Sequence, residues 1–254
     1  MTVCASGDIA RATRRRGESN KAGFWLTSFL GANRYFSGDD SAPPDAEKIY
    51  PMAFLVEQDA GSTVQAHFHQ ADQFQVVVGG AARLGTHDVT DVAVHFTNRF
   101  SAYGPIRASE RGVNYFTLRN GWDPGARYMP GAREELRSRR TAPHREAVAG
   151  PVPPASPVEL AAVDGVTCEP VMQVAADGLG AWRYRLSPGA RAAGPDPAGG
   201  RGQTWLVVGG ALERDAGEKL PGFSCLFVYP TEAPLELVAG ADGAELLCMQ
   251  YPRR

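Results

Sequence analysis

Two histidines one residue apart are the part of this sequence best suited to chemistry. His67 and His69 flank Phe68, and because alternate side chains of a β-strand share a face, both imidazoles can point the same way. With an oxygen ligand such as Gln73 from the next strand, they would form one face of a transition-metal site and leave positions open for water or a substrate. The spacing therefore predicts a catalytic metal site; the competing interpretation is a pair of solvated histidines on a strand edge.

The elements around this pair occur twice, with an offset of about 130 residues. Residues 73–81 (QFQVVVGGA) match residues 203–211 (QTWLVVGGA), and residues 112–118 match residues 243–249. Upstream, Gly61 matches Gly189 at the end of a strand-like run. Three matches in the same order indicate two copies of one fold.

Each copy consists of short runs of β-branched and aromatic residues separated by Gly, Pro and Asp, which is typical of antiparallel strands. Such strands lose their exposed edges by closing into a barrel or a double-sheet jelly roll. The sequence predicts an all-β chain with a flexible tail at residues 1–22, a first barrel at 23–125 and a second barrel at 159–254. Residues 126–158 are predicted as a short helix, over 132–140, followed by a proline-rich linker.

The histidine pair lies in a longer pattern. Gly61, His67, His69 and Gly80 stand at the spacings of the first cupin motif, with Gln73 where that motif has glutamate. This segment resembles the cupin superfamily, and the repeat resembles its two-barrel members, the bicupins. The resemblance implies two tandem cupin barrels and a divalent metal bound by the first one, with Fe(II) as the first candidate and Ni, Mn or Zn also compatible.

The second cupin motif normally supplies one more histidine, and this chain has none at the expected place. Two candidates stay open. His95 lies about eight residues before that position, as a fourth metal ligand or as a catalytic acid or base. Tyr103 lies close to it, as a phenolate ligand or as a catalytic group that hydrogen-bonds a bound substrate.

Gln73 changes the charge expected at the site, because a carboxamide oxygen is a neutral ligand and a weaker one than a carboxylate. A metal held this way keeps most of its charge and favours an anionic substrate group. The second copy has no histidine after His144, so it is predicted to bind no metal. Its inward positions Gln203 and Trp205 are expected to fill the barrel.

Composition excludes several classes of protein. A formal net charge of −2 gives no basic footprint for nucleic acid or for an anionic membrane. The sequence contains no run of about 20 apolar residues and no secretory signal, so a cytoplasmic location is expected.

The first hypothesis for function is a metal-dependent enzyme acting on a small, anionic organic molecule, with an oxygenase ahead of a lyase or isomerase. The second is a bicupin that binds a small ligand without turnover or has a structural role. In either case the second barrel is expected to cover the first or to hold a homodimer.

Overall fold

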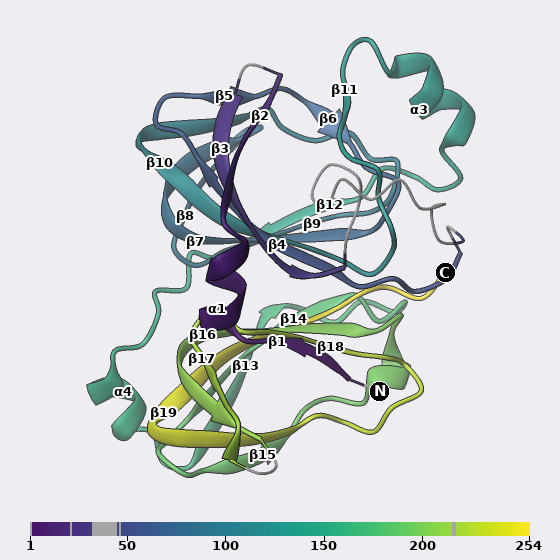
Figure 1. The fold of residues 1–254 in the computed structure, drawn as a ribbon. Coiled ribbons are helices and arrows are strands. Elements are labelled where there is room, and N and C mark those ends of the chain that lie inside the picture. Colours follow the sequence, from purple (N-terminus) through teal and green to yellow (C-terminus); the bar gives the residue numbers. More distant parts are fainter. Residues whose placement is uncertain (1, 21, 32–44, 46, 215–216) are drawn as a thin grey trace. The chain divides into compact units, whose positions relative to one another are not determined.

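The computed structural model describes residues 2–20, 22–31, 45, 47–214 and 217–254 (Figure 1). The chain divides into two compact units. Thr13–Val152 form the N-terminal barrel, and Pro153–Arg254 together with the first twelve residues form the C-terminal barrel. Both are built almost entirely from antiparallel strands, as the sequence predicts (Figure 1).

The described residues of the N-terminal barrel form a nine-stranded sheet in which β7 and β10 are the long central strands. The path runs β12-β9-β7-β10-β4-β3-β2, with β5 paired to β10, β8 paired to β7, and a separate β6-β11 pair. The elements are β2 (Arg15–Ser19), β3 (Ala22–Leu30), β4 (Met52–Gln58), β5 (Thr63–Val64), β6 (His67–Phe68), β7 (Gln73–Leu84), β8 (His87–Thr90), β9 (Ala93–Thr97), β10 (Ile106–Arg119), β11 (Arg127–Tyr128), α3 (Arg133–Arg139) and β12 (Glu146–Ala149).

The C-terminal barrel repeats this plan, with β16 and β19 in the places of β7 and β10. Its described residues form an eight-stranded sheet along the path β1-β18-β16-β19-β14-β13, with β15 paired to β19 and β17 paired to β16. The elements are β1 (Val3–Ala5), α1 (Gly7–Ala10), the 3-10 turn η1 (Arg11–Thr13) that leads out of this unit, α4 (Pro157–Ala161), β13 (Val166–Met172), β14 (Gly180–Leu186), β15 (Arg191–Ala193), the 3-10 turn η2 (Pro197–Gly199), β16 (Gln203–Glu213), β17 (Lys219–Pro221), β18 (Cys225–Val228) and β19 (Glu236–Gln250).

A close glycine contact recurs at the same point of both copies. Gly80 has φ +72°, and a Cβ there would lie 2.3 Å from the carbonyl oxygen of Gly112. Gly210 has φ +64°, and a Cβ there would lie 2.1 Å from the carbonyl oxygen of Gly243. Only glycine allows this approach together with a left-handed backbone, which explains why the repeat keeps these four residues.

Two parts of the predicted domain organisation need correction. Residues 1–22, predicted as a flexible tail, contain β1, which pairs with β18, and β2, which pairs with β3. The alternating burial of β2 shows why, since every second residue there packs against the barrel although the segment is polar overall. Residues 126–158, predicted as a helix and linker, contain the expected helix α3 but also β12, which pairs with β9.

Candidate metal and small-molecule site

Both predicted histidines are buried in the N-terminal barrel, so they are not solvated residues on a strand edge. His67 is 4% exposed and His69 is 8% exposed, and their ring centroids lie 5.1 Å apart at an interplanar angle of 86°. His67 Nδ1 lies 2.7 Å from the carbonyl oxygen of Gln65, and His69 Nδ1 lies 2.8 Å from Asp123 Oδ1. Each acceptor fixes the proton on Nδ1, which leaves the lone pair on Nε2 for another partner.

Both imidazoles are neutral near pH 7. Burial, together with a smaller contribution from the neighbouring His69, lowers the pKa of His67 to about 3. Burial and the nearby guanidinium of Arg119 lower the pKa of His69. Because neutral imidazole is the form that ligates metals, the state of the pair suits a metal ligand.

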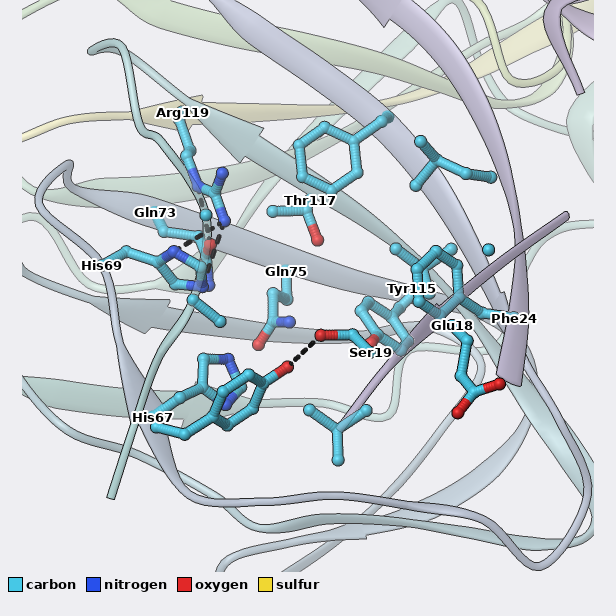
Figure 2. A pocket seen from close by; sticks show the side chains of 18 of the residues that line it. Glu18, Ser19, Phe24, His67, His69, Gln73, Gln75, Tyr115, Thr117 and Arg119 are labelled. Atoms are coloured by element: carbon cyan, nitrogen blue, oxygen red, sulfur yellow. Dashed lines mark hydrogen bonds between the residues drawn. The ribbon is translucent and has the colours of Figure 1, made fainter. Parts of the chain in front are cut away.

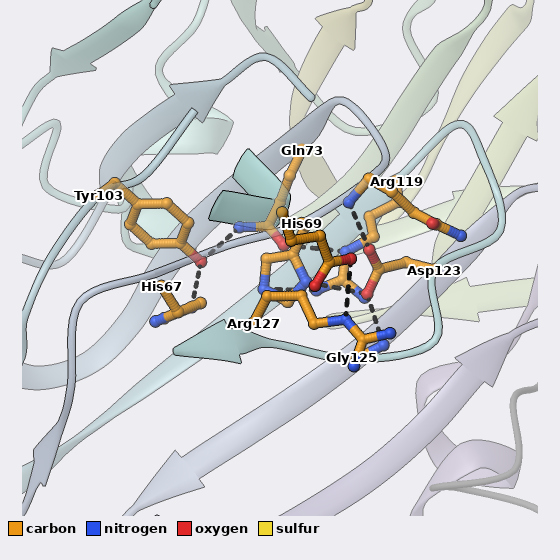
Figure 3. A network of polar contacts seen from close by, with 10 residues as sticks. His67, His69, Gln73, Tyr103, Arg119, Asp123, Gly125 and Arg127 are labelled. Carbon is orange, nitrogen blue, oxygen red and sulfur yellow. Dashed lines mark hydrogen bonds and ion pairs between the residues drawn. The ribbon is translucent and has the colours of Figure 1, made fainter. Parts of the chain in front are cut away.

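Tyr103 and Gln73 meet His67 in one hydrogen-bonded group (Figure 3). The phenol of Tyr103 lies 2.9 Å from His67 Nε2, to which it donates, and it accepts from Gln73 Nε2 at 2.7 Å. Burial raises the pKa of Tyr103 above its ordinary value, so the side chain is a neutral phenol. Of the two roles predicted for Tyr103, this arrangement shows the hydrogen-bonding one.

His95 is not brought to the histidine pair as a fourth ligand. Its Nδ1 lies 2.9 Å from Gln75 Oε1 and its Nε2 lies 3.1 Å from Glu146 Oε1, so both ring nitrogens are occupied. Its ring packs beside Tyr103, with centroids 5.0 Å apart. The acceptor Glu146 comes from β12, within the segment that the sequence predicted as linker, and it holds the His95 ring beside Tyr103.

A buried arginine that the sequence analysis missed lies at the centre of the site. Arg119, 3% exposed, ends β10 directly opposite Gln73 at the start of β7. Its Nε donates to Gln73 Oε1 at 2.9 Å, and one terminal nitrogen lies 3.1 Å from each ring nitrogen of His69. Arg119 could have been predicted from the alternation of the strand, because Tyr115, Thr117 and Arg119 stand at every second position and so share one face.

Asp123 is the counter-charge of Arg119 and the second residue missed. It is fully buried, lies 3.2 Å from the guanidinium, and accepts hydrogen bonds at 2.8 Å from His69 and from the backbone N–H groups of Gln70 and Gly125 (Figure 3). Burial alone would raise the pKa of Asp123, but Arg119 and His69 outweigh it and hold the pKa well below the usual range. The carboxylate is therefore charged and fixes both the arginine and the histidine.

The polar floor of a cavity of about 220 Å³ is formed by His67, His69, Gln73, Tyr103 and Arg119 (Figure 2). Its walls are mainly apolar and aromatic, with Phe24, Leu26, Phe54, Val56, Tyr115 and Tyr128 among the lining residues. Residues of β2 also line it, and Ser19 Oγ lies 2.6 Å from the hydroxyl of Tyr128. An apolar cavity with a few converging polar groups is the usual form of a small-molecule site.

The donor set at the cavity floor fits a divalent metal only in part. His67 and His69 fit, since both are neutral and both have Nδ1 held by an oxygen acceptor, as metal-ligating histidines do. The rest of the shell is atypical, because Gln73 Oε1 and His69 Nε2 already face the guanidinium of Arg119. Among the described residues, no three His, Cys, Asp or Glu side chains gather as a metal-binding group. The fit therefore rests on the histidine pair, and a metal would have to displace Tyr103 from His67 Nε2 and Arg119 from His69 Nε2.

The C-terminal barrel is filled where the N-terminal barrel is hollow. Trp205 and Gln203, the counterparts of Gln75 and Gln73, are both 0% exposed. Trp205 Nε1 donates to Gln203 Oε1 at 3.2 Å, and its ring packs against Tyr184 with centroids 5.3 Å apart. This barrel has a packed interior in place of the histidine pair.

No helix in the described part of the chain is long and apolar enough to span a bilayer.

The sequence matches no protein-family model and no curated protein, whereas many solved structures resemble the fold. Pirin YhhW from Escherichia coli, solved with nickel(II), is 10% identical with a TM-score of 0.59, and the similarity covers 100% of both chains. A putative dioxygenase from Nostoc punctiforme is 11% identical with a TM-score of 0.61, over 98% of this chain and 82% of that one. Oxalate decarboxylase from Bacillus subtilis is 10% identical with a TM-score of 0.55, over 100% and 78%. All are cupin-fold proteins, and this chain accordingly has the cupin fold.

Proposed function

We propose that this protein is a metal-dependent cupin enzyme that acts on a small, anionic organic molecule, and that the N-terminal barrel carries its active site. The observation that carries this proposal is the neutral pair His67 and His69, buried at the floor of a cavity with both Nδ1 atoms held by oxygen acceptors. The nickel(II) in the pirin structure and the name of the putative dioxygenase support a divalent metal and make oxygenase chemistry the first reaction class to test.

In this proposal His67 and His69 hold the metal, with Fe(II) as the first candidate and Ni, Mn or Zn as alternatives. A bound divalent ion would supply Lewis-acid or redox chemistry to the substrate. Asp123 and the carbonyl of Gln65 keep the two imidazoles in the required tautomer and orientation. Tyr103, a neutral phenol, is placed to hold a proton or donate a hydrogen bond at the cavity floor, while the apolar walls exclude water.

The second candidate is a bicupin that binds an organic anion without metal and without turnover. The position of Arg119 favours it, because a permanent cation already faces His69 Nε2 and Gln73 Oε1. For either candidate, we propose that the C-terminal barrel, whose interior is filled, has a structural role, such as covering the first barrel or holding a homodimer.

Metal content separates the two candidates. The full chain purified without chelator is expected to contain about one equivalent of a transition metal, measured by elemental analysis. A His67→Ala/His69→Ala variant is expected to lose it, because the remaining donors are an amide and a neutral phenol, which bind such ions weakly. The matched control is His87→Ala/His144→Ala, which removes two exposed histidines.

Metal retained in the control and lost in the site variant supports the enzyme. Wild-type protein without metal, combined with a site variant as stable as the parent, contradicts it and favours the binding protein.

A further inference from the structure

Two side chains on the wall of the N-terminal cavity each have a polar atom without a hydrogen-bond partner in the described part of the chain. Gln75 is 4% exposed and Thr117 is 3% exposed, and both line the cavity (Figure 2). Gln75 Oε1 lies 2.9 Å from His95 Nδ1, which leaves Nε2 as the free end of the amide. The hydroxyl of Thr117 makes no hydrogen bond to these residues either. Because buried polar atoms are nearly always satisfied, this pair is suited to a ligand.

The two free atoms open into the large cavity. The fully enclosed side-chain atoms that lack a partner belong to other residues, so Gln75 Nε2 and the Thr117 hydroxyl each keep some accessible surface. Gln75 also borders a second cavity of about 10 Å³, but that one exposes only apolar atoms. Thr117 lines the large cavity and not the small one. A molecule in the large cavity can therefore reach both atoms.

The sheet holds the two groups side by side. Thr117 of β10 stands directly opposite Gln75 of β7, and the Cβ atoms of such pairs lie about 5 Å apart. In the next inward-facing pair of the same strands, Arg119 donates to Gln73. That pair is satisfied within the protein, whereas Gln75 and Thr117 are open to a ligand. Since the pairs are two residues apart along the strands, they are separated by about 7 Å.

The chemistry of the pair fits an uncharged acceptor. The amide nitrogen of Gln75 donates, the hydroxyl of Thr117 can donate, and neither group carries charge. Two neighbouring donors suit a carbonyl oxygen, which has two lone pairs. The wall around them is apolar and includes Leu26, Phe54 and Tyr115. An apolar cavity of about 150 Å³ is large enough for benzene, so this one, of about 220 Å³, suits a carbonyl compound of about one ring.

The C-terminal barrel has apolar side chains at the corresponding positions. Trp205 and Cys248 stand opposite each other on β16 and β19, where the first copy has Gln75 and Thr117. Both are 0% exposed, and the indole occupies the interior. The open polar pair therefore distinguishes the hollow copy from the filled one.

We propose that Gln75 and Thr117 form a subsite that binds the carbonyl oxygen of an uncharged group on a small, mainly apolar ligand. This inference deepens the proposed function and rests on it only in taking the same cavity as the working site. A metal at His67 and His69 would hold one end of the ligand and the subsite the other. His95 acts as a positioning residue, because it faces Gln75 Oε1 and leaves Nε2 for the ligand.

The test compares a ketone with a hydrocarbon of similar shape. Dissociation constants of 4′-fluoroacetophenone and of 1-ethyl-4-fluorobenzene, which has CH₂ in place of the carbonyl, are measured on the full chain by ¹⁹F NMR titration. Each titration is made after treatment with a chelator and again with nickel(II) added. The site variants are Thr117→Val, which removes a hydroxyl without a protein partner, and Gln75→Leu/Thr117→Val. The matched control is Thr97→Val, since Thr97 is also 3% exposed but does not line the cavity.

The deciding quantity is the ratio of the hydrocarbon's dissociation constant to the ketone's, because a general change in the cavity affects both probes. In chelator-treated protein, the double variant is expected to lower this ratio at least about fivefold and Thr117→Val about threefold, while Thr97→Val keeps it. A smaller fall in the double variant, an equal fall in Thr97→Val, or ketone binding weaker than about 10 mM overturns the subsite.

The nickel(II) arm separates this inference from the proposed function. A ketone preference that appears only with nickel(II) assigns the carbonyl to the metal, which overturns the subsite and leaves the metal-dependent function standing. A chain that binds no nickel(II) but loses its ketone preference in the double variant contradicts that function and supports the subsite.

Discussion

An Asp123→Asn substitution is expected to lower the free energy of unfolding by about 3–5 kcal/mol, the usual effect of breaking a buried ion pair. Asp123 is 0% exposed and Arg119 is 3% exposed, so the variant would leave a buried guanidinium without a counter-charge. The asparagine would also have to replace a carboxylate that accepts from His69 and from two backbone N–H groups. Urea denaturation of the full chain, followed by circular dichroism, measures the change.

Two further variants make this result specific. Asp88→Asn removes an exposed partner of Arg83 and is expected to change stability by less than about 1 kcal/mol. Arg119→Met/Asp123→Asn removes both buried charges and is expected to recover most of the loss. A loss below about 1 kcal/mol in Asp123→Asn itself would contradict the account of a tightly coupled buried pair.

A Trp205→Ala substitution is expected to lower stability by about 3–5 kcal/mol, because it empties the interior of the C-terminal barrel. Trp205 is 0% exposed, packs against Tyr184 and donates to Gln203. Removing the indole leaves a cavity and an unpaired amide oxygen. Denaturation of the full chain under the same conditions checks the prediction.

Trp25→Ala is the control for that experiment, since Trp25 is 36% exposed and contacts Arg14 at the surface of the other barrel. Its expected effect is at most about 1 kcal/mol. Similar losses of stability in the two tryptophan variants would contradict the claim that Trp205 fills the interior of the C-terminal barrel.

Features that depend on local spacing were predictable from the sequence. The all-β class, the repeat and the placement of His67 and His69 on one face follow from strand periodicity and turn residues. Gly80 and Gly210 are fixed by the backbone approach that each needs, so the same short pattern appears in both copies. The cupin resemblance rests on the spacing of Gly61, His67, His69 and Gly80, and the similar solved structures confirm the cupin fold.

Features that depend on which strands become neighbours were not predictable in the same way. Arg119 reaches the site because the end of β10 pairs with Gln73, and Asp123 reaches it because the chain turns back towards His69. His95 does not line the cavity, and its ring is held by Glu146 of β12, a strand in a segment that the sequence predicted as linker. Each of these contacts joins residues far apart in the chain, and only the register of the sheet determines them.

The most direct test of the central claim, that His67 and His69 hold a metal in the N-terminal barrel, is anomalous diffraction. Crystals of the full chain, grown without chelator and with nickel(II) added, would be measured at the absorption edge of nickel. The account predicts one anomalous peak in the N-terminal barrel, next to Nε2 of His67 and of His69, and none inside the C-terminal barrel. No peak beside these two histidines, with Arg119 still against His69, would contradict it.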